Sequence, residues 1–234
     1  MRRYAWLILS AGLVFSLVGC GDDAEGGGGS GGSGGASTAT VSGTVVDDGD
    51  QPVVGATVSV GTATATSGAV GAFTIEVPVG TELFETKADD HWGSLIPEVV
   101  PSQGLNDVEL FVISDALVEG IGTALGIPVN INKGIVSVSF DDATAAAGDK
   151  ATISAGSEGS FVLDGNDDPV PGNALLASGI AEGNTEVIFV NVDLANGVSV
   201  QASNASDAAC PLEFPTVTYP VEQKIITDIE VICP

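Results

Sequence analysis

The sequence predicts an all-β protein: two small antiparallel β-sandwich domains joined by a short helix, after a signal peptide and a Gly/Ser tether. Three observations support this fold class. Short runs with alternating apolar and polar residues, separated by Gly-, Pro- and Asp-rich turns, recur from residue 41 to the end. Helical spacing of apolar residues is clear in one segment, 114–126. The first 19 residues form an almost wholly apolar leader with two arginines at its start. The expected segments are 1–19, 20–40, 41–112, 113–130 and 131–234.

The leader has the features of a secretory signal that ends at a cysteine. Its apolar stretch, 4–18, is shorter than the roughly 20 residues needed to span a bilayer. It closes with Leu17-Val18-Gly19-Cys20, which resembles the bacterial lipobox. The resemblance implies that the Cys20 thiol receives lipid, that the signal is removed before it, and that the new amino terminus is acylated. Several acyl chains would anchor the protein stably to a membrane.

The residues after Cys20 indicate location and mobility. Gly21 stands where many lipoproteins that stay in the inner membrane carry Asp, so we expect a cell-envelope protein and favour the outer membrane. The tether continues to residue 40, and 26–35 contains only Gly and Ser. Such a segment buries nothing and behaves as a flexible coil.

The first domain is expected to contain short strands in a regular succession. The Asp-rich turn at 47–52 separates the first two strands, and Gly80 follows a further turn where the backbone needs a positive φ. Phe73, Ile75 and Val77 alternate with polar residues and should share one buried face. The expected strands are 41–46, 56–60, 62–66, 72–77, 83–88 and 107–112.

The order of these segments resembles that of a known family. The segments 41–47 (VSGTVVD), 52–58 (PVVGATV), 71–75 (GAFTI) and 77–80 (VPVG) are similar to the carboxypeptidase regulatory-like domain, a small transthyretin-like (prealbumin-like) β-sandwich. The resemblance covers 41–112. It implies a fold and a non-catalytic accessory role, and because the family shares no single ligand, it names no partner.

The segment 114–126 is predicted to be a helix that connects the two domains. Leu117, Ile121 and Leu125 recur at four-residue spacing. Ser114 can cap the amino-terminal end, and Gly126 can end the helix.

The second region, 131–234, has segments that match the first. ATVSVG at 56–61 resembles ATISAG at 151–156, an offset of 95, and the strand at 73–77 resembles 189–193 at an offset of 116. The closing strands DVEL and DIEV are 121 residues apart. A competing register aligns the Asp-rich turns at 47–55 and 164–172. We prefer the first register because it pairs strands with strands, and we therefore expect a diverged second sandwich.

The charge excludes one class of partner. After removal of the leader, four lysines face 31 acidic residues, which gives a net charge of −27. A surface of this sign repels nucleic acid and anionic lipid headgroups. We expect no nucleic-acid partner.

The remaining cysteines are Cys210 and Cys233. In an oxidising compartment such a pair forms a disulfide by default, so we predict that bond.

Catalysis is not predicted. His91 is the only histidine, so a Ser-His-Asp or Cys-His arrangement would have to use it, yet it lies in a predicted loop. No cofactor is expected. Beside it, Trp92 is the one tryptophan of the mature chain. An exposed Trp92 could serve as a platform for a sugar, and the alternative is a ring folded over the edge of the sandwich.

An acidic turn is the candidate metal site. Asp164, Asn166 and Asp168 fit the first ligand positions of an EF-hand loop, but Pro169 stands where Gly is required and Leu175 where a bidentate Glu belongs. A looser calcium site is the alternative to a plain acidic β-turn.

Together these features predict a non-catalytic, membrane-anchored lipoprotein that presents β-sandwich binding or structural modules at the cell envelope to a glycan, protein or other envelope ligand that the sequence does not identify. The alternative is a carbohydrate- or cell-wall-binding lipoprotein that uses the Trp92 loop.

Overall fold

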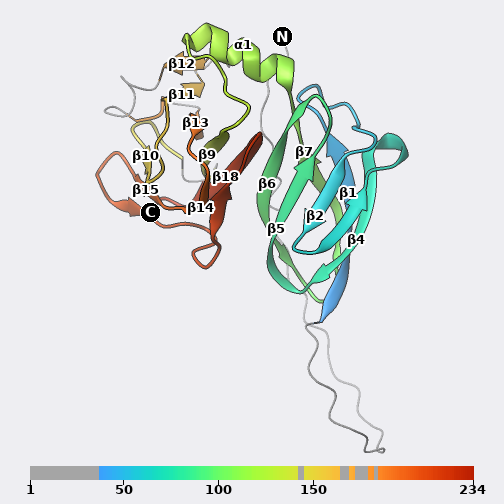
Figure 1. Cartoon of the computed structure of the whole chain (residues 1–234). Helices are drawn as coiled ribbons and strands as arrows, with labels where there is room; N and C mark the ends of the chain where they lie inside the picture. Colours follow the sequence, from blue (N-terminus) through green and yellow to red (C-terminus); the bar gives the residue numbers. More distant parts are fainter. Residues whose placement is uncertain (1–36, 142–144, 164–168, 172–178, 182–183) are drawn as a thin grey trace, which may run out of the picture. The chain divides into compact units, whose positions relative to one another are not determined.

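A computed structural model describes residues 37–141, 145–163, 169–171, 179–181 and 184–234 (Figure 1). Residues 37–234 form one compact unit. The predicted fold class is confirmed: strands dominate the described chain, and they pack as mainly antiparallel sheets around buried apolar clusters.

The first sandwich has two layers. One is the sheet β4-β1-β7, in which β1 pairs antiparallel with β4 and parallel with β7. The other is the series β3-β2-β5-β6, in which neighbouring strands are antiparallel. The strands are β1 (Thr38–Val46), β2 (Thr57–Val60), β3 (Ala63–Thr66), β4 (Ala72–Pro78), β5 (Gly80–Lys87), β6 (His91–Val100) and β7 (Leu105–Phe111), with the short 3-10 helix η1 (Ala69–Gly71) between β3 and β4.

The alternation of apolar and polar residues along the strands determines which side chains form the core between these layers. Phe73, Ile75 and Val77 are buried on one face of β4, as predicted. They pack against residues of β1, β2, β5 and β7 such as Val41, Val58, Phe84 and Leu110. Gly80 has a φ of +135°, which confirms the expected turn.

The predicted helix is confirmed as α1 (Asp115–Leu125). The Ser114 side chain accepts a hydrogen bond from the Leu117 N–H at 3.3 Å, and Gly126 ends the helix with a φ of +69°. Val118 and Gly122 are its buried residues. Within the described residues, no helix has the length and apolar character required to cross a membrane.

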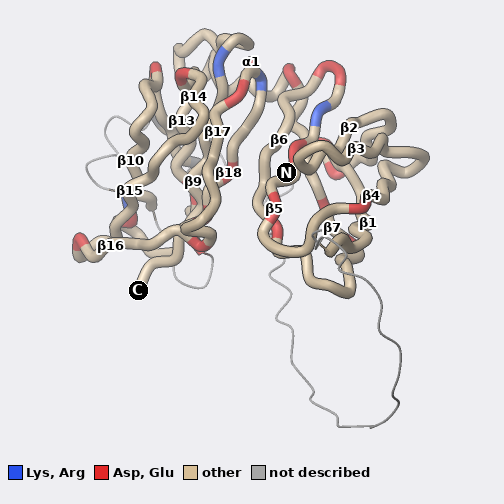
Figure 2. The backbone as a smooth tube through the Cα atoms, turned by 60° about the horizontal axis from the view of Figure 1, so that its bottom comes forward, with Lys and Arg blue, Asp and Glu red and all other residues tan. Residues whose placement is uncertain are grey.

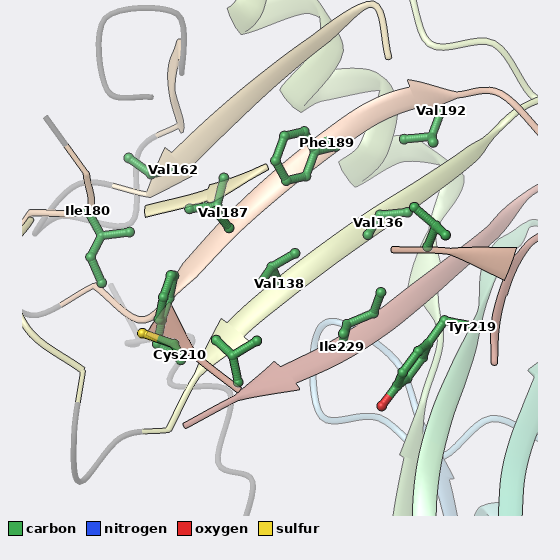
Figure 3. Packing of buried hydrophobic residues seen from close by; sticks show 14 of the residues in the cluster. Val136, Val138, Val162, Ile180, Val187, Phe189, Val192, Cys210, Tyr219 and Ile229 are labelled. Carbon is green, nitrogen blue, oxygen red and sulfur yellow. The ribbon is translucent and has the colours of Figure 1, made fainter. Parts of the chain in front are cut away.

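The second half is built around another buried cluster. Its main sheet runs β12-β11-β13-β9-β18, and β10-β15-β16 and β14-β17 form two smaller sheets. Figure 3 shows side chains such as Val138, Phe189 and Ile229 converging on this core. The strands are β9 (Gly134–Phe140), β10 (Lys150–Ile153), β11 (Gly159–Leu163), β12 (Pro169–Pro171), β13 (Glu186–Val192), β14 (Ala195–Val198), β15 (Val200–Ser203), β16 (Ala209–Cys210), β17 (Tyr219–Val221) and β18 (Ile225–Val231).

The two halves share a pattern of strand pairing. β9 pairs antiparallel with β13 and parallel with β18, just as β1 pairs antiparallel with β4 and parallel with β7. β10 pairs antiparallel with β15, as β2 does with β5. These strand equivalences follow the offsets of the preferred sequence register. The division into two domains remains a prediction, because residues 37–234 are a single compact unit.

Strand β18 joins the halves directly. It pairs with β9 on one side and parallel with β6 on the other, through Ile225–Gly93, Ile226–Ser94 and Thr227–Leu95. The β3-β2-β5-β6 series therefore continues into the sheet of the second half (Figure 1). This connection was not predicted, because His91, at the start of β6, was expected to lie in a loop.

Candidate functional site

The structure describes only some of the predicted site residues. The disulfide between Cys210 and Cys233 is present and joins β16 to the segment after β18, which confirms that prediction. Cys20, the lipidation candidate, lies outside the described residues. The metal candidates Asp164, Asn166 and Asp168 also lie outside them.

Of the two interpretations of Trp92, an exposed sugar platform and a ring folded over the edge of the sandwich, the structure excludes the first. Trp92 lies in strand β6 and has 1% of its surface exposed. It packs with Ile113, Ile135 and Ile226, which come from β8 (Ile113–Ser114), β9 and β18. The ring is buried between the halves, so it presents no surface on which a sugar could stack.

The prediction of a loop around His91 is also wrong, because this residue belongs to strand β6. His91 is the first residue of β6, where it pairs with Ser114 of β8. It is partly buried, and its Nδ1 lies 2.6 Å from the Asp89 carbonyl oxygen. This contact fixes the ring against its own turn rather than beside a nucleophile.

A group of carboxyl side chains that has no local signal in the sequence lies where β6 and β18 diverge. We call it the acidic junction and define it as Glu98, Glu213, Asp228 and Glu230. Asp228 and Glu230 come from β18, Glu98 from β6, and Glu213 from the segment after β16. That segment pairs with β18, because the Glu213 N–H donates to the Glu230 carbonyl at 3.0 Å.

Burial perturbs the acids of this junction. It raises the pKa of Asp228 to about 6, although the Ser139 hydroxyl donates to its Oδ1 at 2.8 Å and partly offsets the effect. Burial and a hydrogen bond to the Glu213 carboxyl raise the pKa of Glu230 to about 8. Burial, followed by the charge of Glu213, raises the pKa of Glu98. Asp228, Glu230 and Glu98 therefore bind protons more tightly than solvated carboxyls do.

Tyr219 lies near enough to the same group for its charges to act on the Tyr219 hydroxyl. Tyr219 is 1% exposed, and its ring lies close to Ile229 of β18 (Figure 3). Within the described chain its hydroxyl has no hydrogen-bond partner. Burial and the charges of Asp228, Glu213 and Glu230 raise the pKa of Tyr219, so the hydroxyl stays protonated beside the carboxyls.

The lysines of the described chain pair with acids other than those of the acidic junction. Acidic positions far outnumber basic ones along the backbone (Figure 2). Each lysine there forms an ion pair with an acid outside the acidic junction. The pairs are Lys87 with Glu85 and Glu222, Lys133 with Glu158 and Asp193, Lys150 with Asp207, and Lys224 with Asp115.

Lys133 forms ion pairs with two acidic side chains from separate segments of the chain. Its Nζ lies 2.8 Å from Asp193 and 3.2 Å from Glu158. Hydrogen bonds to Asp193 and Glu158 raise the pKa of Lys133, while hydrogen bonds from Asn191 and Lys133 lower the pKa of Glu158. The Lys133 amine therefore stays protonated. A protonated amine has no lone pair with which to attack a carboxyl or amide carbon. The fully buried Asn191 side chain also holds the linker, through the Pro128 carbonyl and the Asn130 N–H.

The described residues offer little geometry for other chemistry. Within the described ranges, no group of three or more His, Cys, Asp or Glu side chains is placed to hold a metal ion. An open hollow of about 470 Å³ lies beside the last turns of α1 and is lined by Glu119, Gly122, Thr123, Gly126, Pro128 and Val129. Glu119 is its one titratable lining residue, so it contains no acid–base pair.

Comparisons with known proteins identify no family. No protein-family model matches the sequence, and no curated protein matches it. Among solved structures the chain is similar to the Bacillus anthracis TIE protein at 12% identity and a TM-score of 0.28, covering 84% of this chain and 34% of that one. The chain thus spans about a third of the length of that protein.

Two further structures show a similar level of likeness. One is BcpA, the major pilin subunit of Bacillus cereus, at 12% identity and a TM-score of 0.29, covering 84% of this chain and 69% of the pilin. The other is a DUF3823 family protein from Parabacteroides merdae, at 10% identity and a TM-score of 0.26, covering 85% and 100%. Similarities this weak carry no argument about function.

Proposed function

We propose that this protein is a non-catalytic lipoprotein that holds a β-sandwich binding or structural module at the cell envelope, with the outer membrane favoured over the inner. The observation that carries the proposal is the succession at the amino terminus. An apolar leader ends at Leu17-Val18-Gly19-Cys20, a Gly/Ser run follows, and strand β1 begins at Thr38. This order matches lipid, flexible spacer and folded module.

The fold supports a presenting role rather than a catalytic one. The module is fastened by the Cys210–Cys233 disulfide, which suits an exported protein in an oxidising compartment. Its net charge keeps it off anionic membrane surfaces and favours display into solution. The resemblance of residues 41–112 to the carboxypeptidase regulatory-like domain implies the same accessory role.

The test is metabolic labelling of the full chain with radioactive palmitate. Cys20→Ser should lose the label and keep its leader, while Gly21→Ser serves as a control that retains Cys20 and should be labelled and cut. Equal labelling of Cys20→Ser and the unaltered chain would refute the proposal. Density-gradient fractionation of labelled envelopes then separates the outer membrane from the inner.

A further inference from the structure

One Asn–Gly pair occurs in the sequence, Asn196–Gly197, and it lies in strand β14. Both residues are exposed, while Val198 after them is buried. In an Asn–Gly pair the main-chain nitrogen reaches the side-chain amide most readily, because glycine carries no Cβ to hinder the approach. Asparagine is counted among the thermolabile residues of proteins. The surroundings of the pair decide whether this chemistry can occur in the folded chain.

The register of β14 against β17 slips at this pair. The paired positions on either side are Ala195 with Val221 and Val198 with Tyr219. Two residues of β14, Asn196 and Gly197, therefore stand opposite Pro220 alone. Such an insertion is a β-bulge, which disrupts the ladder locally. Pro220 has no N–H to donate, and its carbonyl accepts a hydrogen bond from the Thr227 hydroxyl of β18 at 2.7 Å.

Other parts of the described chain leave the pair free as well. Outside the sheets, no hydrogen bond of the described residues engages the Gly197 N–H or the Asn196 side chain. The second edge of β14 pairs with no strand in the described chain. The Asn196 side chain can therefore turn back toward the nitrogen of the next residue without breaking a contact.

A second pair of this kind, Asp48–Gly49, is held by hydrogen bonds. The Ser114 N–H donates to Asp48 Oδ1 at 2.6 Å, and the Gly49 N–H donates to Asp47 Oδ1 at 2.8 Å. The side chain that would be attacked and the nitrogen that would attack it are thus both engaged. The same two-residue pattern is held at 48–49 and free at 196–197.

We propose that Asn196–Gly197 is a site at which the folded chain modifies itself without an enzyme. The Gly197 main-chain nitrogen loses its proton to water or hydroxide and attacks Asn196 Cγ. The new N–Cγ bond closes a cyclic imide, and the Cγ–Nδ2 bond breaks, so that the amide nitrogen takes up a proton and leaves as ammonia. A water molecule then adds across either C–N bond of the imide and gives aspartate or isoaspartate at position 196.

The products alter the second half of the protein in two ways. Either product adds a carboxylate to a chain that is already strongly acidic. Isoaspartate also routes the main chain through the former side chain, which lengthens β14 by one methylene. Val198, Tyr219 and Val221 around the bulge belong to the buried cluster of this half. The conversion therefore loosens the β14–β17 pairing as the protein ages.

Peptide mapping of the aged full chain tests the proposal. The protein is incubated at pH 8.5 in water enriched in heavy oxygen, both folded and unfolded in guanidinium chloride with its disulfide reduced. Modification of Asn196 in the folded chain should proceed within about threefold of its rate in the unfolded chain, because no local opening is required. Isomerisation of Asp48 should be roughly tenfold or more slower in the folded chain, since two hydrogen bonds must first open.

Variants identify the attacking and the attacked groups. Asn196→Gln places the amide one methylene farther away and should abolish most of the modification. Gly197→Ala adds a Cβ that hinders the nitrogen and should slow the reaction several-fold. That Cβ would lie 2.9 Å from Thr218 Cγ2, so the urea midpoint of this variant is compared with that of the unaltered chain. The control Asn106→Gln changes an exposed asparagine in β7 and should leave the reaction at Asn196 unaltered.

Amide hydrogen exchange measures the effect on packing. Exchange at Tyr219 and Val221 should be faster in aged than in fresh protein, and equally slow in aged and fresh Asn196→Gln. If the fold slows modification of Asn196 as much as it slows that of Asp48, the bulge gives no access and the proposal is overturned. Unchanged exchange at Tyr219 and Val221 after conversion would overturn the inferred loosening of β14–β17.

Discussion

Replacement of Asp228 by Asn should stabilise the protein at neutral pH. Asp228 is 8% exposed in the last long strand, and the Ser139 hydroxyl donates to its Oδ1. Burial raises its pKa from an ordinary 3.8 to about 6, so the folded state holds this proton more tightly than the unfolded state. Stability from this group is complete below about pH 4, and it is lost as pH rises from 3.8 to about 6.

The magnitude follows from the size of the pKa shift. About two units at 1.36 kcal/mol each correspond to roughly 3 kcal/mol that ionised Asp228 costs the fold above pH 6. The Asn amide has nearly the same shape and charge as the protonated carboxyl, and its Oδ1 can still accept from Ser139. We therefore expect Asp228→Asn to unfold at a higher urea concentration at pH 7.5 and at nearly the same concentration at pH 4.

The measurement is urea denaturation at both pH values for the unaltered chain, Asp228→Asn and the control Asp89→Asn. Asp89 is exposed, so its substitution removes the same charge without relieving burial. The difference between the two pH values should shrink by roughly 3 kcal/mol in Asp228→Asn only. Parallel loss of stability with pH in all three proteins would show that Asp228 does not carry this cost.

Three further predictions concern the frame. Reduction of the Cys210–Cys233 bond should lower the free energy of unfolding by roughly 3 kcal/mol in the chain-entropy model, and denatured, unreduced protein should show neither thiol to an alkylating reagent. Gly93→Ala should destabilise the protein by about 1–3 kcal/mol, because its added Cβ would meet close contacts. Gly120→Ala has open space around its added Cβ and should stabilise α1 by up to about 1 kcal/mol. The urea midpoints of the two variants compare these effects. The melting temperature should rise smoothly with sodium chloride, and a saturable calcium shift at about 0.5 M salt that Asp164→Ala abolishes would contradict purely general repulsion.

Local patterns were enough to find most strands of the first half and the helix. Phe73, Ile75 and Val77 alternate with polar residues because one face of β4 is buried and the other is exposed. Ser114 and Gly126 mark the ends of α1 because backbone groups at helix termini need such caps. The disulfide also followed from composition, since an exported chain with two remaining cysteines has one pairing available.

The acidic junction could not be found in this way, because its members come from three separate segments. Asp228 and Glu230 lie on one face of the closing strand, because alternate residues of a strand share a face. In the sequence alone, such a face looks like an ordinary solvent-exposed one. Asp228 is buried there because β9 covers one edge of β18 and β6 with Pro211–Glu213 covers the other. Long-range pairing of this kind has no local signal.

The missed start of strand β6 and the missed junction have one physical cause, the burial of that strand. Residues Trp92 to Leu95 are all buried, so the strand lacks the alternation by which its neighbours were recognised. Without β18, β6 would be an edge strand of the first sandwich, with unpaired backbone groups that invite association. The second half covers that edge, and the Trp92 ring is buried in the process. Trp92, one of the candidate ligand residues, is thus part of the contact between the two halves.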